Sequence, residues 1–446
     1  MTLRFGTDGV RGIANAELTP ELVLALGRAA ARVLGEGPFL VGRDTRISGP
    51  LLQAALSAGL ATEGADVLDL GVFPTPGVAW LSAADGQPAA MISASHNPFP
   101  DNGVKFFQTG GRKLSDETEA ALEAELDRLL AHPTAHARRT GPALGRLLPG
   151  DGHARYEAAL SASIGGRNLA GLSVVLDCAN GAASEVAPEV LRALGAEVTV
   201  LHDAPDGVNI NDGSGSTHPQ DLQAHVVAAG AAVGLAFDGD ADRVLAVDHT
   251  GELVDGDQLI AICALDRRAQ GRLPGDTVVV TVMANLGFRQ AMAAHGIEMI
   301  ETDVGDRYVL EEMERGGWAL GGEQSGHIIF GDLATTGDGV LTGLQVLDVM
   351  ARTGQSLADL AAVMVRLPQV LRNVRVATRG MDIKGSEELT LAIKAVEADL
   401  GERGRVLVRP SGTEAVVRVM VEAVTAEEAE AACETLCQVV SRALGA

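Results

Sequence analysis

The amino-acid sequence predicts an α/β fold, in which three similar mixed α/β sheet domains and a C-terminal α+β domain surround a central cleft. Two observations predict this class. A unit of strand, polar loop, helix and strand occurs three times, and its copies lie about a hundred residues apart, as expected for a repeated domain. The last segment has a different pattern of short strands and one long helix, which is typical of an α+β domain.

Each repeated unit has its polar loop directly after the carboxyl end of a strand, where α/β sheets place their ligands. A helical pattern at 20–34 precedes the first unit. The first unit is expected to have strands at 39–42 and 65–70 with a helix at 51–59 between them. The second has strands at 173–177 and 197–201 with a helix that ends at Gly195, and the third has strands at 277–281 and 297–301 with a helix through Ala294. The last segment is expected to contain strands at 406–408 and 416–421 and a helix at 426–444.

Changes in composition suggest where the domains end. Residues 126–150 are rich in Ala, Arg, His and Pro, a glycine-bounded turn lies at 251–256, and a third break falls near Pro368. We therefore expect domains at 1–150, 151–253, 254–367 and 368–446.

The composition is that of a soluble globular protein, with 446 residues, 46% hydrophobic and 21% charged. The formal net charge of −24 argues against nonspecific binding to nucleic acid or to anionic membranes, although local arginines can still bind an anion. No stretch reaches the length of a membrane span, and the first residues lack the apolar core of a signal peptide. The four cysteines form no CxxC pair, and Cys433 and Cys437 are expected to be neighbours on a helix. A cytoplasmic location is the expectation.

The turn Ser93-Ala94-Ser95-His96-Asn97-Pro98 follows an apolar run, 89–92, that is typical of a buried strand. We expect this turn to present a hydroxyl, an imidazole and several backbone N–H groups to solvent. Our hypothesis is that Ser95 carries a phosphoryl group. The alternative is a Ser/Asn/Pro loop without chemistry, and the turn alone does not decide between them.

Three carboxylates alternate in Asp238-Gly239-Asp240-Ala241-Asp242-Arg243, directly after the apolar strand 232–237. Their oxygens can converge on one hard cation such as Mg²⁺. A solvated acidic turn is disfavoured, because like charges at this spacing repel one another unless a cation neutralises them. An EF-hand fails because its sixth position holds Arg243 instead of Gly and its twelfth holds His249 instead of Glu. In a phosphatase of the haloacid-dehalogenase kind, a Thr would stand where this loop has Asp242.

Four further loops are candidates for the same site, and each has a plainer alternative. The turn 321–327 contains Glu, Ser and His, which suit sugar hydroxyls or acid–base work, although a single His in a turn is more often structural. The segment 409–414 combines Arg, Ser, Gly and Thr as an anion nest, or is an ordinary hairpin. Lys105 could approach the Ser95 turn or form a surface ion pair. The glycine-rich loop 4–12 could deliver Arg11 to a phosphate or be a flexible turn.

Two common nucleotide-binding motifs are missing. The sequence has no P-loop pattern and no Gly-x-Gly-x-x-Gly after a strand, so neither a P-loop kinase nor dinucleotide binding is supported. The segment 213–218 is best interpreted as a loop.

Taken in order, these loops resemble those of the α-D-phosphohexomutase superfamily over almost the whole chain. The matching motifs are Gly-Thr-Asp-Gly-Val-Arg-Gly, Ser-Ala-Ser-His-Asn-Pro, Asp-Gly-Asp-Ala-Asp-Arg, Gly-Glu-Gln-Ser-Gly-His and Arg-Pro-Ser-Gly-Thr-Glu. Within the superfamily, Gln324 and the runs 91–107 and 303–308 are similar to the bacterial branch that acts on glucosamine phosphates. Related phosphomannomutases and phosphoglucomutases usually have Met at the position of Gln324.

The resemblance implies an isomerase, an intramolecular phosphotransferase that interconverts glucosamine 6-phosphate and glucosamine 1-phosphate on the route to UDP-N-acetylglucosamine and cell-wall sugars. It implies one Mg²⁺ and a glucosamine 1,6-bisphosphate intermediate. It also implies a phosphoserine at Ser95. The implied Mg²⁺ ligands are Ser95, Asp238, Asp240 and Asp242. The resemblance implies that the reacting end is lined by Arg11, Lys105, Arg243 and His327, and that the sugar is contacted by Glu323, Ser325 and His327. The phosphate that is not transferred would be held by Arg409, Ser411, Gly412, Thr413 and Arg418. Lys105 or His327 would move the proton.

One position departs from the family. Ala415 stands where Pro is usual, which loosens the turn but removes no hydrogen-bond donor. A bisphosphate intermediate must turn end over end, so we expect a separate and mobile C-terminal domain.

Two rival functions stay open at this point. They are a phosphomannomutase/phosphoglucomutase of the same superfamily and a non-catalytic sugar-phosphate sensor on the same fold. We expect small-molecule sugar phosphates as partners, with neither nucleic acid nor membrane. A homodimer is compatible with the sequence, which is otherwise silent on oligomeric state.

Overall fold

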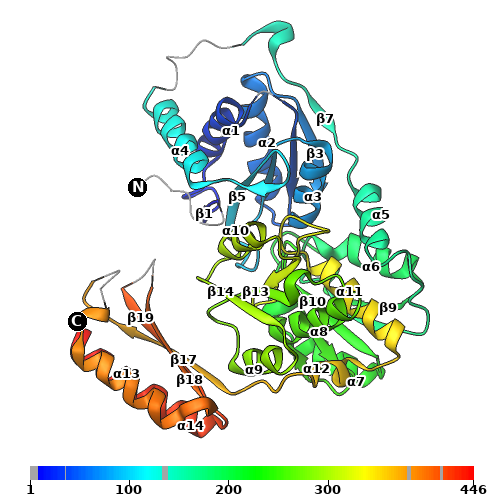
Figure 1. Cartoon of the computed structure of the whole chain (residues 1–446). Coiled ribbons are helices and arrows are strands. Elements are labelled where there is room, and N and C mark those ends of the chain that lie inside the picture. Colours follow the sequence, from blue (N-terminus) through cyan, green and yellow to red (C-terminus); the bar gives the residue numbers. More distant parts are fainter. Residues whose placement is uncertain (1–8, 36, 133–138, 379–382, 412–414, 446) are drawn as a thin grey trace. The chain divides into compact units, whose positions relative to one another are not determined.

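The computed structural model describes residues 9–35, 37–132, 139–378, 383–411 and 415–445. The chain divides into two compact bodies, and each is described by itself. The first contains Met1–Met283 and Ile297–Val363, and the second contains Ala284–Gly296 and Met364–Ala446. Figure 1 labels the elements along the chain. Among the described residues, no helix combines the length and apolar character needed to cross a membrane.

The first sheet of the larger body has the order β1-β5-β4-β2-β3-β7, with β6 paired to β5. Its strands are β1 (Val10–Ile13), β2 (Phe39–Arg43), β3 (Val67–Val72), β4 (Ala89–Ile92), β5 (Asp101–Gln108), β6 (Arg112–Lys113) and β7 (Leu147–Pro149). Strands β2, β3 and β4 are parallel, so the loops after β2 and β4 leave the same edge of the sheet. This topology places the Ser95 turn beside the loop that follows Arg43.

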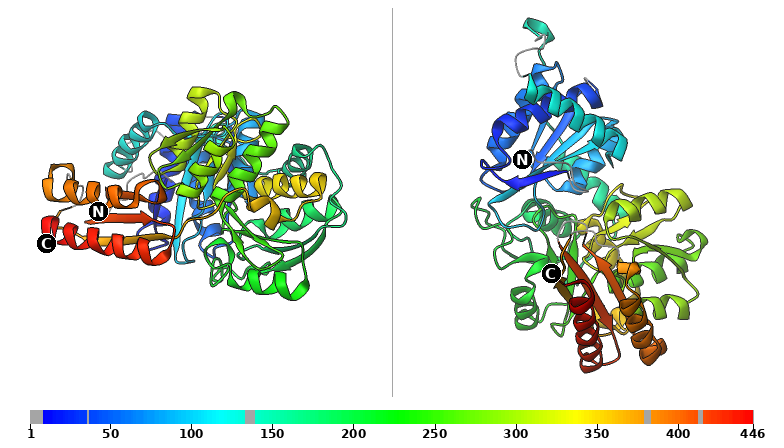
Figure 2. Two further views of the ribbon diagram at one scale, coloured as in Figure 1. Left: turned by 60° about the horizontal axis from the view of Figure 1, so that its bottom comes forward. Right: turned by 90° about the vertical axis from the view of Figure 1, so that its left-hand side faces the viewer.

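Helices cover both faces of this sheet, as Figure 2 shows. They are α1 (Pro20–Leu34), α2 (Gly49–Thr62), α3 (Thr75–Asp85) and α4 (Asp116–Ala131). Val41 packs into the core formed with α1, α2 and α4. The next residue, Gly42, faces α3, because a Cβ at this position would lie 2.6 Å from Val78. Helix α1 begins at Pro20 after Thr19, whose side chain accepts a hydrogen bond from the Leu22 amide.

The second sheet has the order β12-β11-β10-β8-β9. Its strands are β8 (Ser173–Asp177), β9 (Glu197–Leu201), β10 (Val233–Phe237), β11 (Val244–Asp248) and β12 (Leu253–Val254), and its helices are α5 (His153–Ser163), α6 (Ala183–Ala193) and α7 (Gln220–Ala229). All five residues of β10 are buried between β8 and β11. The acidic loop therefore starts from a rigid central strand.

The third sheet has the order β14-β13-β15-β16. Its strands are β13 (Thr277–Thr281), β14 (Glu298–Thr302), β15 (Leu320–Gly322) and β16 (Ile328–Phe330), and the nearby helices are α8 (Gly256–Ala269), α10 (Asp306–Gly316), α11 (Gly339–Thr353) and α12 (Leu357–Ala361). Asp338 caps α11 by accepting from the Leu341 amide at 2.9 Å, and it also accepts from the Tyr156 hydroxyl at 2.8 Å. Burial raises the pKa of Asp338 to about 6, although these hydrogen bonds oppose the shift.

The smaller body contains an antiparallel sheet in the order β17-β19-β18. Its elements are α9 (Leu286–Ala294), β17 (Gln369–Arg375), α13 (Glu387–Leu400), β18 (Arg405–Pro410), β19 (Val416–Glu422) and α14 (Ala426–Leu444). Residues of α13 and α14 share one apolar core with the strands. Cys433 and Cys437 are neighbours on α14, as predicted, with their sulfur atoms 4.0 Å apart.

The predicted mixed α/β sheets and the final α+β segment are confirmed, as are the three strand–helix–strand units. One local expectation is wrong. Arg11 lies on strand β1, not in a loop, because residues 10–13 pair with β5 in antiparallel register. Gly9 permits close backbone approach to β5, because a Cβ on Gly9 would lie 2.3 Å from the Val104 carbonyl oxygen. The exact domain limits stay a prediction.

Candidate functional site

Ser95 lies at the centre of the site, in the turn that follows the buried strand β4. Its hydroxyl donates to Asp238 Oδ2 at 2.6 Å and lies 3.3 Å from His96 Nδ1. The residue is only 2% exposed, so the expectation of a solvent-facing hydroxyl is wrong. The cause is tertiary packing, because the acidic loop of the second sheet covers the turn. Burial lowers the pKa of His96, and Arg243 and Arg11 lower it further.

The three aspartates converge as the sequence predicts. Asp238, Asp240 and Asp242 are between 1% and 5% exposed. One carboxylate oxygen from each lies within 4.8 Å of the others. Asp238 accepts from Ser95 and from the Arg243 amide, and Asp240 accepts from Thr75 Oγ1 at 2.6 Å.

Two oxygens of this cluster, Asp240 Oδ1 and Asp242 Oδ1, are buried and have no hydrogen-bond partner. Buried carboxylate oxygens without a partner are costly, so a cation between them fits the donor set. Burial raises the pKa of Asp238 well above its usual range, and the charges of Asp242 and Asp240 add to this effect. The same repulsion favours a bound cation.

Three basic side chains surround Asp242. His327 Nδ1 is 3.6 Å from Asp242 Oδ2, Lys105 Nζ is 3.9 Å from the same oxygen, and Arg243 Nε is 3.8 Å from Oδ1. Burial alone would raise the pKa of Asp242, but these three groups, His327 first, hold it well below its usual range. Asp242 is therefore ionised while Asp238 resists ionisation.

The His327 ring is enclosed within the protein. Its Nε2 atom accepts from the Gly337 amide at 3.0 Å, which places the ring proton on Nδ1, toward Asp242. Burial alone would lower the pKa of His327, whereas Asp242 and Asp306 raise it. A second proton would have to go on Nε2 and would break the bond from Gly337. Both ring nitrogens are thus engaged with protein groups.

The turn between β15 and β16 carries the predicted sugar contacts. Glu323 Oε1 accepts from the Gly305 amide at 3.2 Å, and Ser325 is exposed. The Gln324 side chain donates to Asp255 at 3.3 Å, and the backbone carbonyl of Gln324 accepts from the Gly256 amide. Gln324 therefore belongs to the predicted sugar loop, but its side chain binds the start of α8 through Asp255.

The predicted phosphate cradle lies in the smaller body. Arg409 on β18 is paired in register with Arg418 on β19, and the Ser411 amide donates to the Val416 carbonyl at 2.9 Å. Residues directly opposite each other on antiparallel strands have their side chains on the same face of the sheet, so both guanidinium groups can reach one anion. Gly412 and Thr413, predicted to belong to this cradle, lie outside the described residues.

Sequence reasoning missed several residues that contact the Ser95 turn and the acidic loop. Arg46 and Asn211 donate to backbone carbonyls of the turn, and Thr75 holds Asp240. Arg46 lies in a polar loop after a strand, which was the available signal. Asn211 and Thr75 carry no comparable signal. Arg11, from β1, packs its Cγ above Gly103 and lowers the pKa of His96, so it lies within electrostatic reach of the turn.

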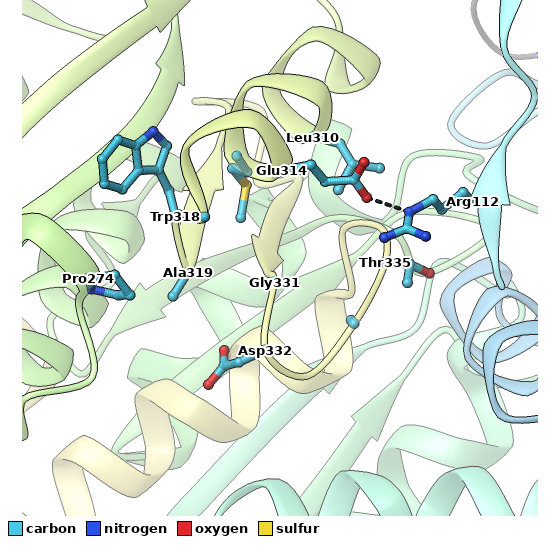
Figure 3. Close-up of a pocket in the computed structure, with 12 residues that line it drawn as sticks. Arg112, Pro274, Leu310, Glu314, Trp318, Ala319, Gly331, Asp332 and Thr335 are labelled. Carbon is cyan, nitrogen blue, oxygen red and sulfur yellow. Dashed lines mark hydrogen bonds and ion pairs between the residues drawn. The ribbon is translucent and has the colours of Figure 1, made fainter.

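A separate cavity of about 300 Å³ lies between Arg112 and the β15–β16 region (Figure 3). Arg112 and Glu314 point toward each other on one side, with Nε and Oε1 2.5 Å apart, and Trp318 lies on the other side. None of the predicted site residues lines this cavity. This cavity is therefore separate from the Ser95 cluster.

Comparison with known proteins identifies the family of the chain. Four models of the phosphoglucomutase/phosphomannomutase family match: alpha/beta/alpha domain I at 2–132, domain II at 154–251, domain III at 255–367 and the C-terminal domain at 371–439. The chain therefore belongs to the phosphoglucomutase/phosphomannomutase family.

A relative within this family is the phosphoglucosamine mutase of Moorella thermoacetica, which is 56% identical and covers 96% of each chain. Two solved structures share the fold. A phosphoglucomutase/phosphomannomutase family protein from Burkholderia thailandensis has a TM-score of 0.79 at 24% identity, covering 98% of this chain and 97% of that one. The N-acetylphosphoglucosamine mutase of Aspergillus fumigatus, in complex with GlcNAc-6P and magnesium, has a TM-score of 0.71 at 20% identity, covering 99% and 96%.

Proposed function

We infer that this protein is a phosphoglucosamine mutase, an isomerase that interconverts glucosamine 6-phosphate and glucosamine 1-phosphate. Its product would feed UDP-N-acetylglucosamine synthesis and hence peptidoglycan precursors. The observation that carries this inference is the buried Ser95 hydroxyl, 2.6 Å from one carboxylate of the three-aspartate cluster. The full-length similarity to the Moorella enzyme supports the choice of substrate.

We propose that Ser95 donates and accepts the phosphoryl group. In the first half-reaction, a hydroxyl oxygen of the sugar phosphate attacks the phosphorus of phosphorylated Ser95. The new bond joins that oxygen to phosphorus, and the bond from Ser95 Oγ to phosphorus breaks. The sugar hydroxyl loses its proton to a base, and Ser95 Oγ takes up a proton to become a hydroxyl again. The second half-reaction is the reverse, on the other phosphate of glucosamine 1,6-bisphosphate. Such transfer needs positioning and charge neutralisation more than covalent help.

The aspartate cluster fits one Mg²⁺ per chain. Asp238, Asp240 and Asp242 would hold it, and a phosphate oxygen on Ser95 would be a further ligand. Their oxygens are hard donors, and two of them, both buried, have no hydrogen-bond partner in the protein. When bound, the ion would neutralise charge on the phosphoryl group during transfer.

Cationic residues would balance the remaining charge. A phosphoserine carries about −1.5 to −2 charges and the aspartates add three more, so a divalent ion alone leaves an excess. Arg243 and Lys105 beside Asp242, together with Arg11, would supply the difference. We propose Lys105 as the group that moves the proton, because both nitrogens of His327 are engaged within the protein. His327 would then orient Asp242.

Recognition of the rest of the substrate is assigned to two further groups. Glu323 and Ser325 would contact sugar hydroxyls, with His327 beside them. The phosphate that is not transferred would be held by Arg409, Ser411, Gly412, Thr413 and Arg418. The domain limits near 150, 253 and 367 and a cytoplasmic location belong to the same proposal. So does the expectation that the partners are small sugar phosphates, with a homodimer compatible.

A panel of substrates tests the proposal. Turnover is measured with Mg²⁺ on glucosamine 6-phosphate, mannose 1-phosphate and glucose 1-phosphate. Glucosamine phosphate should have the highest kcat/KM, whereas a higher value for mannose or glucose phosphate would make the protein a phosphomannomutase/phosphoglucomutase. A sensor would turn over none of the three.

Replacement of Ser95 tests the covalent step. The Ser95→Ala variant should fold and lose turnover. Intact-mass spectrometry of the wild type should find molecules about one phosphate heavier than the sequence, and this species should be missing from the variant. Full activity in Ser95→Ala would contradict the phosphoserine role.

A further inference from the structure

We infer that Arg46 and Asn211 form a positioning pair that fixes the backbone of Ser95 and thereby aims its hydroxyl. The inference rests on the proposed role of Ser95 in phosphoryl transfer. Neither residue is placed among the groups that bind metal or sugar. Both act through backbone carbonyls, so their effect should fall on the transfer step and not on substrate binding.

Ser95 has a backbone conformation that must be held in place. Its φ is +51°, in the left-handed region that residues other than glycine rarely adopt. Its amide donates to Ser93 Oγ at 2.9 Å, and its carbonyl is the acceptor for both proposed residues. Bonds on both sides of the residue therefore fix the direction in which Oγ points.

Arg46 reaches the turn from the loop after β2. It is fully buried, and its Nη2 atom donates to the carbonyls of Ser95 at 3.2 Å and Asn97 at 2.5 Å. Its Nη1 atom pairs with Asp44, which also accepts from Ser93 Oγ at 2.6 Å. Arg46, Asp44 and Ser93 thus form a chain of contacts that returns to the Ser95 amide. A guanidinium suits this task because its fixed planar donors can serve several acceptors at once.

Asn211 reaches the same two carbonyls from the second sheet's side. Its Nδ2 atom donates to Ser95 O at 2.9 Å and to Asn97 O at 3.0 Å. Gly239 in the acidic loop leaves room for this contact, because a Cβ there would lie 2.7 Å from Ser95 O and 2.8 Å from Asn211 Nδ2. Because the Asn211 amide donates to the Ala179 carbonyl at 2.9 Å, Asn211 also ties the Ser95 turn to the loop after β8.

The positioning pair matters because the Ser95 hydroxyl must be in the same place at the start and at the end of a catalytic cycle. Ser95 is phosphorylated before the first transfer, free after it, and phosphorylated again after the second. Addition and removal of a phosphoryl group change the repulsion from Asp238, whereas the bonds to the backbone are unaffected by it. A displacement of about 1 Å at a reacting atom can cost about 100-fold in rate.

The test uses Arg46→Lys and Asn211→Gly in the full chain with Mg²⁺. Lysine keeps the charge beside Asp44 but lacks the planar fork. Glycine accepts the left-handed φ of Asn211 (+58°) without steric strain and removes both donor hydrogens. We expect kcat to fall about 10- to 100-fold in each variant, with KM for glucosamine 6-phosphate changed by less than about threefold. The rate at which glucose 1,6-bisphosphate phosphorylates Ser95 in one turnover, followed by intact mass, should fall with kcat.

Arg267→Lys is the matched control. Arg267 is also buried, pairs with Asp332 at 2.6 Å and lies over the Phe330 ring, and it does not contact the turn. This variant should lose stability but keep kcat within about twofold. If Arg46→Lys does not fold, Asn211→Gly decides.

The outcomes separate this inference from the proposed function. If wild-type turnover depends on Ser95 but the folded Arg46 and Asn211 variants keep kcat within about twofold, the positioning role is wrong and the mutase assignment stands. If KM rises while kcat is unchanged, the pair serves binding and the inference is also wrong. If Ser95→Ala is as active as the wild type, the proposed function fails and the inference fails with it.

Discussion

Asp240→Asn should make the metal-free protein more stable and should remove most of the stabilisation that Mg²⁺ gives. The side chain is 1% exposed, and one oxygen from each aspartate of the cluster lies within 4.8 Å of the others. At an effective dielectric constant of about 20, two unit charges at this separation repel by about 3.5 kcal/mol. Asparagine removes this charge and can still accept from Thr75 through its own carbonyl oxygen.

The magnitudes follow from these contacts. The raised pKa of Asp238 already relieves part of the repulsion, so we expect a gain of about 1–3 kcal/mol in the free energy of unfolding without metal. Excess Mg²⁺ at 100 times its Kd should stabilise the wild type by about 2.7 kcal/mol and Asp240→Asn by much less. Urea unfolding followed by circular dichroism, in EDTA and in excess Mg²⁺, measures both quantities.

Asp248→Asn is the control for loss of a buried carboxylate. Asp248 is 5% exposed, and its Oδ1 atom accepts from Thr250 N, Thr250 Oγ1 and Glu252 N. The Asp248→Asn variant should lose about 1–3 kcal/mol in the free energy of unfolding and keep the full stabilisation by Mg²⁺. The reasoning is refuted if Asp240→Asn is less stable than the wild type in EDTA, or if Mg²⁺ stabilises both proteins equally.

Three other predictions use local geometry. Gly337→Ala places a Cβ 2.5 Å from the buried His327 ring, so this variant should lower kcat at least about tenfold and reduce the free energy of unfolding by about 1–3 kcal/mol. Gly37→Ala is the control, because a Cβ there meets no atom within 4 Å, and it should change neither quantity. Equal melting temperatures and kcat values for the two variants would contradict this. Asp338 has a folded pKa of about 6 against 3.8, so its stabilising protonated form is lost as pH rises through this window. The stability of Asp338→Asn relative to wild type should therefore increase by up to about 3 kcal/mol between pH 4 and pH 6, as measured by urea unfolding, and a flat difference would argue against the shift. Arg418→Gln should raise KM for sugar phosphates about tenfold or more with little loss of stability, whereas Arg372→Gln, whose partners lie on α14, should leave KM unchanged in the coupled assay.

The sequence alone predicted the residue types of the candidate site and the elements that carry them. The acidic loop had to follow a buried strand, because an apolar run precedes Asp238, and β10 is buried at every residue. Alternating carboxylates in one turn converge whatever the surrounding fold, so the predicted cation site needed no long-range information. The turn after β4 was predicted for the same reason, since the apolar strand and Pro98 bound it on either side.

Only the tertiary structure decided how the serine is held and what encloses it. Ser95 is buried because a loop 143 residues away covers it, and its carbonyl is fixed by donors 49 and 116 residues away. The His327 ring accepts a hydrogen bond from the Gly337 amide, and the Gln324 side chain donates to Asp255, the residue that caps α8. Such contacts join loops from different sheets, and local periodicity and spacing carry no information about which loops will meet. The residue types therefore predicted what the site can do, and the packing of the sheets decided which side chains aim it.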